Sequence, residues 1–213
     1  NAHTLPEFKQ HINAIRYHKG TPSFVGRNHF ISMDWNPNNQ EKAYIKNITP
    51  IIKENGKPIF KIASALIDKP NWYKHLGQER IYLPEASPNK VQEQLNKLRN
   101  MGILTQAATV TIDYIPLNAL FDAEQQANMN LFKQIPHGAI LEIVRPNWQL
   151  QDTIGTNLHV SHLGFVIWKK GIPYFRNASS AHQIVEDEIL VDYLKHTLSS
   201  PTIKGIHLEL ALP

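Results

Sequence analysis

The residue of this sequence that is best suited to chemistry is His162, in the segment Ser161–Trp168, which alternates like a β-strand. Side chains on a strand point alternately to its two faces, so Leu163, Phe165 and Ile167 share one face, which we expect to pack on the core. His162 then lies on the other face beside Gly164, whose missing side chain leaves space next to the imidazole. A fixed imidazole with an open approach is what a general base requires. A half-exposed strand histidine next to a glycine bulge is the alternative interpretation of the same spacing.

Asn177 lies on the next predicted strand and is the candidate to orient His162. The two side chains can meet only if they reach the same sheet face, which the register decides. A two-residue turn at Lys170-Gly171 makes Asn177 a diagonal neighbour of His162, and a four-residue loop from Trp168 to Gly171 places them directly opposite. A three-residue loop would put them on opposite faces. The hypothesis therefore requires an even loop length.

A loop that mixes aromatic and polar residues is the second candidate site. It contains Arg27, His29 and Phe30, followed by Asp34 and Trp35. Sugars present C–H faces that stack on aromatic rings and hydroxyls that bond to polar groups, so this mixture suits a saccharide. A loop whose aromatic residues anchor it to the core, with polar residues capping its turns, has the same composition.

A metal site is a further candidate, because the chain contains 11 histidines. His159 and His162 are three apart, a spacing that suits ligands on a helix and not on a strand, where odd separations face opposite ways. The sequence contains no His-Glu-x-x-His motif. A zinc site assembled from distant residues stays open as an alternative.

Composition excludes several other classes of protein. The 22 basic and 18 acidic residues are spread along the chain, and Lys169-Lys170 is the only basic doublet, so no nucleic-acid-binding surface is expected. The apolar runs are too short to span a bilayer. The sequence has no cysteine, and therefore no disulfide, no Cys-ligated zinc and no thiol nucleophile among its 213 residues. The first residue is Asn1 rather than Met, so we expect either a removed leader or a longer parent chain.

The elements that position these residues form a helical first half and a strand-rich last third. Thr4 to Glu7 is a capping box that opens a helix reaching Gly20, residues 21–39 form an ordered loop, and Asn55-Gly56 is a hairpin turn. Further helices are predicted at Pro88–Gly102, Asp122–Ile135 and Ile184–Leu198, and strands at Thr109–Ile115, Ala139–Val144, Ser161–Trp168, Ile172–Ala178 and Ile206–Leu212. This order predicts a single α+β domain, residues 1–213, in which an antiparallel sheet packs against helices.

Three stretches together resemble a bacterial family long known only as a domain of unknown function, which is allied to the NlpC-type papain-like cell-wall cysteine peptidases. They are Phe24–Phe30 with Asp34-Trp35, then Pro136–Ile143, then His159–Ile167 followed by Phe175–Ser180. The resemblance covers nearly the whole chain. It implies a papain-like fold and an N-acetylmuramoyl-L-alanine amidase, which cuts the amide between the lactyl group of muramic acid and the stem peptide, preferably in 1,6-anhydromuropeptides.

The resemblance also implies roles for particular residues. His162 would be the general base and acid, and Asn177 would orient it. Arg27, His29, Asp34 and Trp35 would lie near the substrate. His159 stands where such relatives carry an acidic residue, so it is a further substrate-binding candidate.

The family attacks with a cysteine on a helix that precedes the first helix of this sequence. We therefore expect the nucleophile segment to lie outside these 213 residues. No cofactor and no metal are implied, and the substrate places the protein in the periplasm or outside the cell.

Two other functions stay open. One is an inactive muropeptide-binding module that never had the cysteine, which the sequence encoded upstream of Asn1 would distinguish. The other is a zinc-dependent amidase. Oligomeric state is not predicted.

Overall fold

The computed structural model describes residues 2–82 and 87–213, which form two compact units. Each unit is assembled from three stretches of chain. Unit 1 comprises Asn1–Asn38, Ala65–Val110 and Asn147–Leu158, and unit 2 comprises Asn39–Ser64, Thr111–Pro146 and His159–Pro213. The single domain expected from the sequence stays a prediction.

Unit 1 is mainly helical. Its helices are α1 (Leu5–Arg16), α3 (Lys69–Lys74), α4 (Pro88–Gly102) and α7 (Gln151–Ile154), with 3₁₀ turns at His18–Gly20 and Gln78–Arg80. The capping box is confirmed, because the Glu7 N–H donates to Thr4 Oγ1 at 3.3 Å and the Thr4 N–H donates to Glu7 Oε2 at 3.1 Å. The α4 helix is confirmed with its predicted bounds, and it buries Leu95 against Tyr73 and Leu76.

The structure corrects two helix boundaries in unit 1. The first helix ends at Arg16, and Tyr17 already has an extended backbone, so the helix does not reach Gly20. The predicted loop is partly helical, since a π-helical turn spans Ile31–Trp35 and α2 (Asn36–Glu41) continues from it toward unit 2. The sequence pattern did not indicate this helical segment, because its aromatic, Asn and Pro residues have low helix propensity.

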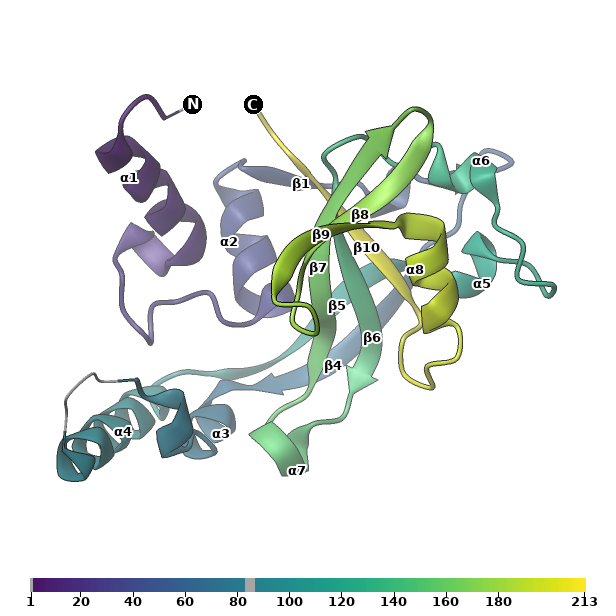
Figure 1. Ribbon diagram of the computed structural model, residues 1–213. Coiled ribbons are helices and arrows are strands. Elements are labelled where there is room, and N and C mark those ends of the chain that lie inside the picture. The colour runs from purple at the N-terminus through teal and green to yellow at the C-terminus, as the bar shows by residue number, and fades with distance from the viewer. Residues whose placement is uncertain (1, 83–86) are drawn as a thin grey trace. The chain divides into compact units, whose positions relative to one another are not determined.

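Most residues of an eight-stranded sheet, shown by arrows in Figure 1, belong to unit 2. The strand order is β4-β5-β10-β6-β7-β8-β9, and β1 also pairs with β10. The strands are β1 (Ile45–Asn47), β4 (Lys61–Asp68), β5 (Ala107–Pro116), β6 (Ile140–Trp148), β7 (Leu158–Lys169), β8 (Ile172–Ser179), β9 (Ile184–Ile189) and β10 (Gly205–Ala211). The pairs of β10 with β1, β5 and β6, and of β8 with β7 and β9, are antiparallel. The α+β class and the large antiparallel sheet are therefore confirmed, together with all five predicted strands.

Helices and short turns complete unit 2. They are α5 (Leu117–Leu120), α6 (Met129–Phe132), α8 (Leu190–Thr197) and a 3₁₀ turn at Thr49–Ile51. Helix α8 packs on β8 and β9 (Figure 1). The hairpin at Asn55-Gly56 is confirmed between the short strands β2 (Lys53–Glu54) and β3 (Lys57–Pro58), with positive φ at both turn residues.

Two predicted helices of unit 2 are wrong in part. Only Met129–Phe132 is helical within the segment expected to form a helix from Asp122 to Ile135. Gln125 there has a φ of 58°, which is incompatible with a continuous helix, and Asp122 caps a turn instead. The segment expected to form a helix from Ile184 to Leu198 begins as strand β9 and becomes helical only at Leu190.

The assignment of faces on β7 is also corrected. Val166 is fully buried, whereas Phe165 is 46% exposed, so the face that carries His162 and Gly164 is the one that packs on the core. Both faces of this strand carry apolar residues. Alternation alone could therefore not identify the covered face.

A polar cluster is buried within the sheet of unit 2. His207 is 2% exposed, its Nδ1–H donates to Asp113 at 2.9 Å, and its Nε2–H donates to Glu209 at 3.0 Å. Burial disfavours a charge on this imidazole, but the hydrogen bonds to Asp113 and Glu209 more than offset that effect and raise its pKa to about 10. His207 is therefore a buried cation at neutral pH.

Within residues 2–82 and 87–213, no helix combines the length and the apolar character needed to cross a bilayer.

Candidate functional site

His162 and Asn177 are hydrogen-bonded in unit 2. The two-residue turn at Lys170-Gly171 pairs Lys169 with Ile172 and Gly164 with Asn177, so Asn177 is the diagonal neighbour of His162. The distance between His162 Nε2 and Asn177 Oδ1 is 2.9 Å. The even loop length that the hypothesis required is therefore present, and the two side chains meet.

A carboxylate fixes the orientation of the Asn177 side chain. Asn177 Nδ2 donates to Glu188 Oε1 at 3.1 Å. A carboxylate can only accept, so the amide nitrogen must face Glu188 and the carbonyl oxygen must face His162. The proton of the neutral imidazole is then on Nε2, which leaves the lone pair of Nδ1 as the basic site.

The His162 ring packs against Phe175. The two ring centroids are 5.7 Å apart in an edge-to-face arrangement, and Phe175 in turn contacts Tyr193 of α8 at 4.7 Å. A Cβ placed on Gly164 would lie 2.7 Å from one carbon of the Phe175 ring and 2.9 Å from another. The expectation that Gly164 leaves open space beside the imidazole is therefore wrong, because Phe175 fills that space and supports His162.

His159 is placed differently from His162. It is only 1% exposed, and its burial lowers its pKa to about 4, so the imidazole is neutral in the physiological range. A side chain this buried presents no surface to a substrate in this conformation. Among the described residues there is also no group of three or more His, Asp or Glu side chains arranged to hold a metal ion.

The aromatic–polar loop of unit 1 is ordered by its own contacts. The His29 Nε2–H donates to the Phe24 carbonyl at 2.7 Å, and the His29 ring packs 4.8 Å from Phe24 and 5.0 Å from Trp72. Burial lowers the pKa of His29, so it is a neutral imidazole at pH 7.

Asp34 stabilises the same loop. One carboxylate oxygen forms an ion pair with Lys69, and the other accepts from the Phe30 N–H at 3.3 Å. Trp35 is half-buried at the end of the π-helical turn. Asp34 therefore has a structural partner at each oxygen, as the core-anchored interpretation of this loop requires.

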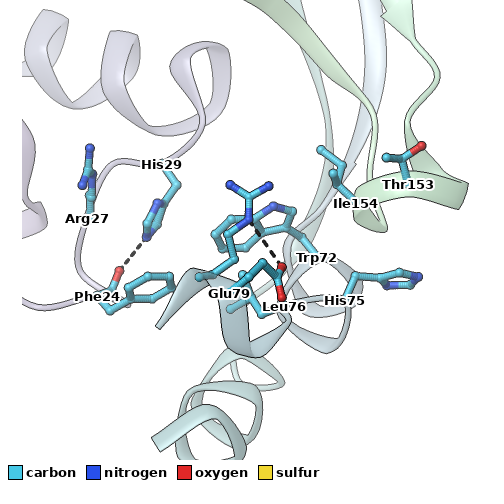
Figure 2. A pocket seen from close by; sticks show the side chains of 10 residues that line it. Phe24, Arg27, His29, Trp72, His75, Leu76, Glu79, Thr153 and Ile154 are labelled. Carbon is cyan, nitrogen blue, oxygen red and sulfur yellow. Dashed lines mark hydrogen bonds and ion pairs between the residues drawn. The ribbon is translucent and has the colours of Figure 1, made fainter. Parts of the chain in front are cut away.

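A cavity of about 420 Å³ lies in unit 1 next to this loop. Figure 2 shows Arg27 and His29 on one side, Thr153 and Ile154 on the other, and Trp72 between them. The remaining lining residues are Phe24, His75, Leu76, Glu79 and Arg80. The cavity thus combines aromatic walls with cationic groups, a hydroxyl group and the carboxylate of Glu79.

The sequence-predicted residues form two groups. His162 and Asn177 meet in unit 2, and Arg27 and His29 line the cavity in unit 1, whereas Asp34 and Trp35 do not appear among its described lining residues. Glu188 and Trp72 were missed. No local pattern marked either residue, because Glu188 lay in a predicted helix and Trp72 reaches the cavity from α3.

Comparison with known proteins identifies the class. The family model described as AmiA-like, N-acetylmuramoyl-L-alanine amidase-like, matches residues 1–203. The chain is therefore an amidase-like protein. It belongs to the AmiA-like family, which confirms the amidase part of the resemblance.

Solved structures agree with this family. A Legionella pneumophila protein of family model DUF1460 is 43% identical, with a TM-score of 0.97 over 100% of this chain and 71% of its own. An N-acetylmuramoyl-L-alanine amidase from Bacteroides uniformis has a TM-score of 0.60 at 19% identity, over 99% of this chain and 75% of its own, which shows a shared fold. No curated protein matches the sequence.

Proposed function

We propose that this protein hydrolyses the amide between the lactyl group of N-acetylmuramic acid and the L-alanine of a stem peptide. His162 is the general base and acid, and the nucleophile is a cysteine outside these 213 residues, which contain none. The observation that supports this proposal best is the His162–Asn177 hydrogen bond of 2.9 Å, because it gives the imidazole an oriented, basic Nδ1.

His162 transfers a proton in each step of this reaction. Nδ1 takes the proton of the thiol, and the thiolate attacks the lactyl carbonyl to form a tetrahedral intermediate. The imidazolium then protonates the nitrogen of L-alanine as the C–N bond breaks, leaving a thioester. Water, deprotonated by His162, hydrolyses the thioester to a lactyl carboxylate and regenerates the thiol.

The cavity in unit 1 supports the proposed substrate class. Trp72 and Phe24 offer aromatic faces for the apolar side of a sugar ring, and Arg27 offers donors for hydroxyl or carboxylate groups. We assign the saccharide of a muropeptide, with the 1,6-anhydro form preferred, to this cavity. Asp34 and Trp35 act here by holding the loop, and His159 is left out of the binding set because it is buried.

The proposal includes a papain-like core and a location in the cell envelope outside the cytoplasm, where peptidoglycan fragments are found. The AmiA-like family membership supports this location.

The test uses the full-length protein with an N-acetylmuramoyl-peptide substrate. We expect His162→Ala to lower kcat/KM by about 100-fold or more, because a general base contributes roughly that much. His182→Ala is the matched control, since His182 is exposed and bonded to Glu186. EDTA should leave turnover unchanged, and iodoacetamide should abolish it. Full activity in His162→Ala would refute the assignment, and binding without turnover by the wild type would indicate a binding module.

A further inference from the structure

Glu188 lies on β9, beside the strand that carries Asn177. In the register of β8 and β9, Glu188 is directly opposite Phe175, and Asn177 is opposite Glu186. Glu188 therefore reaches Asn177 diagonally, and their hydrogen bond measures 3.1 Å. The result is a chain of three polar groups on one face of the sheet, His162–Asn177–Glu188.

The other acidic residues of β9 have different partners. Glu186 accepts from His182 Nδ1 at 2.9 Å, and Asp187 binds Arg176 at 2.7 Å. Glu188 is thus the acidic residue of this strand whose described hydrogen bond is directed at the His162 pair. This hydrogen bond is shielded from solvent, because Asn177 is only 5% exposed. Water therefore competes little for the hydrogen bonds of the Asn177 carboxamide.

The orientation of a carboxamide is not fixed by its shape. If Asn177 rotated by 180° about its terminal bond, Nδ2 would face His162, whose Nε2 would then have to accept. The proton of the neutral imidazole would move to Nδ1, and Nδ1 could no longer accept a proton from a thiol. A partner that can only accept prevents this rotation, because it must face Nδ2.

We propose that Glu188 is a positioning residue for the amidase reaction, which holds Asn177 in the orientation that keeps the neutral His162 protonated at Nε2. The inference rests on the proposed function for its catalytic consequence. The structural part of the inference is the effect of Glu188 on the tautomer of His162, and this effect can be measured without any turnover.

Three substitutions of Glu188 separate this role from a general structural one. Glu188→Gln keeps an oxygen that can accept from Asn177 Nδ2, but it adds an NH2 group that can pair with the rotated amide. Glu188→Ala removes the acceptor, and Glu188→Met removes it while filling a similar volume. Glu186→Ala is the matched control, because it deletes a carboxylate from the same strand whose described hydrogen bonds go to His182 and not to Asn177.

The first readout is the ¹⁵N chemical shifts of the His162 ring in the full-length protein, at a pH where the ring is neutral. We expect a pure Nε2–H tautomer in the wild type and in Glu186→Ala. Glu188→Gln, Glu188→Ala and Glu188→Met should show a mixture of the two tautomers, because none of them gives Asn177 a partner that can only accept. A pure Nε2–H tautomer in folded Glu188→Ala or Glu188→Met would overturn the inference.

The second readout is the split between kcat and KM. Loss of the outer hydrogen-bond partner of a metal-bound histidine typically costs about 10- to 100-fold, and we expect a loss of this order in kcat for Glu188→Ala and Glu188→Met, with KM changed less than about twofold. Glu188→Gln should lose less than Glu188→Ala, because Gln can still accept from Asn177 Nδ2 in one of its two orientations. An unchanged kcat in Glu188→Ala would also overturn the role. Failure of the proposed function gives a different result. Full activity in His162→Ala would refute the catalytic role of His162, but it would not change the effect of the Glu188 variants on the His162 tautomer.

Discussion

Gly164→Ala tests the packing that supports His162. The added Cβ would lie 2.7 and 2.9 Å from two carbons of the Phe175 ring, and even closer to the Arg176 carbonyl oxygen. Ordinary contacts of such atoms are near 3.5–4.0 Å. The carbonyl belongs to β8, which is paired on both sides, by β7 and β9, so it cannot move away freely. Phe175 is fully buried and equally constrained.

Overpacking of a rigid core typically costs about 1–3 kcal/mol, and two constrained neighbours place this site at the upper end. We expect Gly164→Ala to lower the free energy of unfolding by about 3 kcal/mol, which corresponds to a Tm lower by about 6–12 °C for a chain of this size. Because Phe175 supports the His162 ring, kcat should fall as well.

Urea denaturation followed by circular dichroism measures the stability change. Gly26→Ala is the control, since the atom nearest to its added Cβ is the hydroxyl of Ser23, a side chain that can turn away. We expect the control to cost less than about 1 kcal/mol. If Gly164→Ala lowered the free energy of unfolding by less than about 0.5 kcal/mol, β8 would have to shift easily to accommodate the added Cβ. The interpretation of Phe175 as a rigid support would then be wrong.

Two further predictions concern stability. The pKa of His207 is raised from 6.5 to about 10, so its contribution to the free energy of unfolding is complete below pH 6.5 and is lost as the pH rises to about 10. By linkage this contribution is at most about 5 kcal/mol. His207→Gln should therefore make the free energy of unfolding less dependent on pH, as measured by urea denaturation from pH 6 to pH 10. Gly102→Ala should lower the free energy of unfolding by more than about 2 kcal/mol, because the added Cβ would overlap the buried Tyr73 side chain; a thermal melt that matches the wild type would contradict the packing of α4 on α3.

The elements that could be predicted from the sequence are those specified by local chemistry. The Thr4 capping box, the Asn55-Gly56 turn and Pro88 at the start of α4 each act within a few residues, and each is found in the structure. Strand β9 was missed because Ile189, Leu190, Tyr193 and Leu194 follow a helical spacing, and the predicted helix was extended back from them to Ile184. Only the pairing with β8 shows that Ile184–Ile189 is a strand.

The candidate site could be predicted in part for the same reason. The contact of His162 with Asn177 depends on one two-residue turn, so counting residues along the chain gave its register. The role of Phe175 under Gly164 depends on which face of β7 is covered, and Glu188 depends on the pairing of β8 with β9. Neither is encoded within a short stretch of sequence.

The interleaving of the two units has a practical consequence for work on this protein. Because each unit consists of three separated stretches, no single truncation yields either one as a contiguous polypeptide. Excising the sheet region or the helical region for crystallisation, or exchanging one of them with a homologue, would need several simultaneous splice points. Under the function proposed above, substrate preference is therefore better changed by point substitution at Trp72 or Arg27 than by grafting a module.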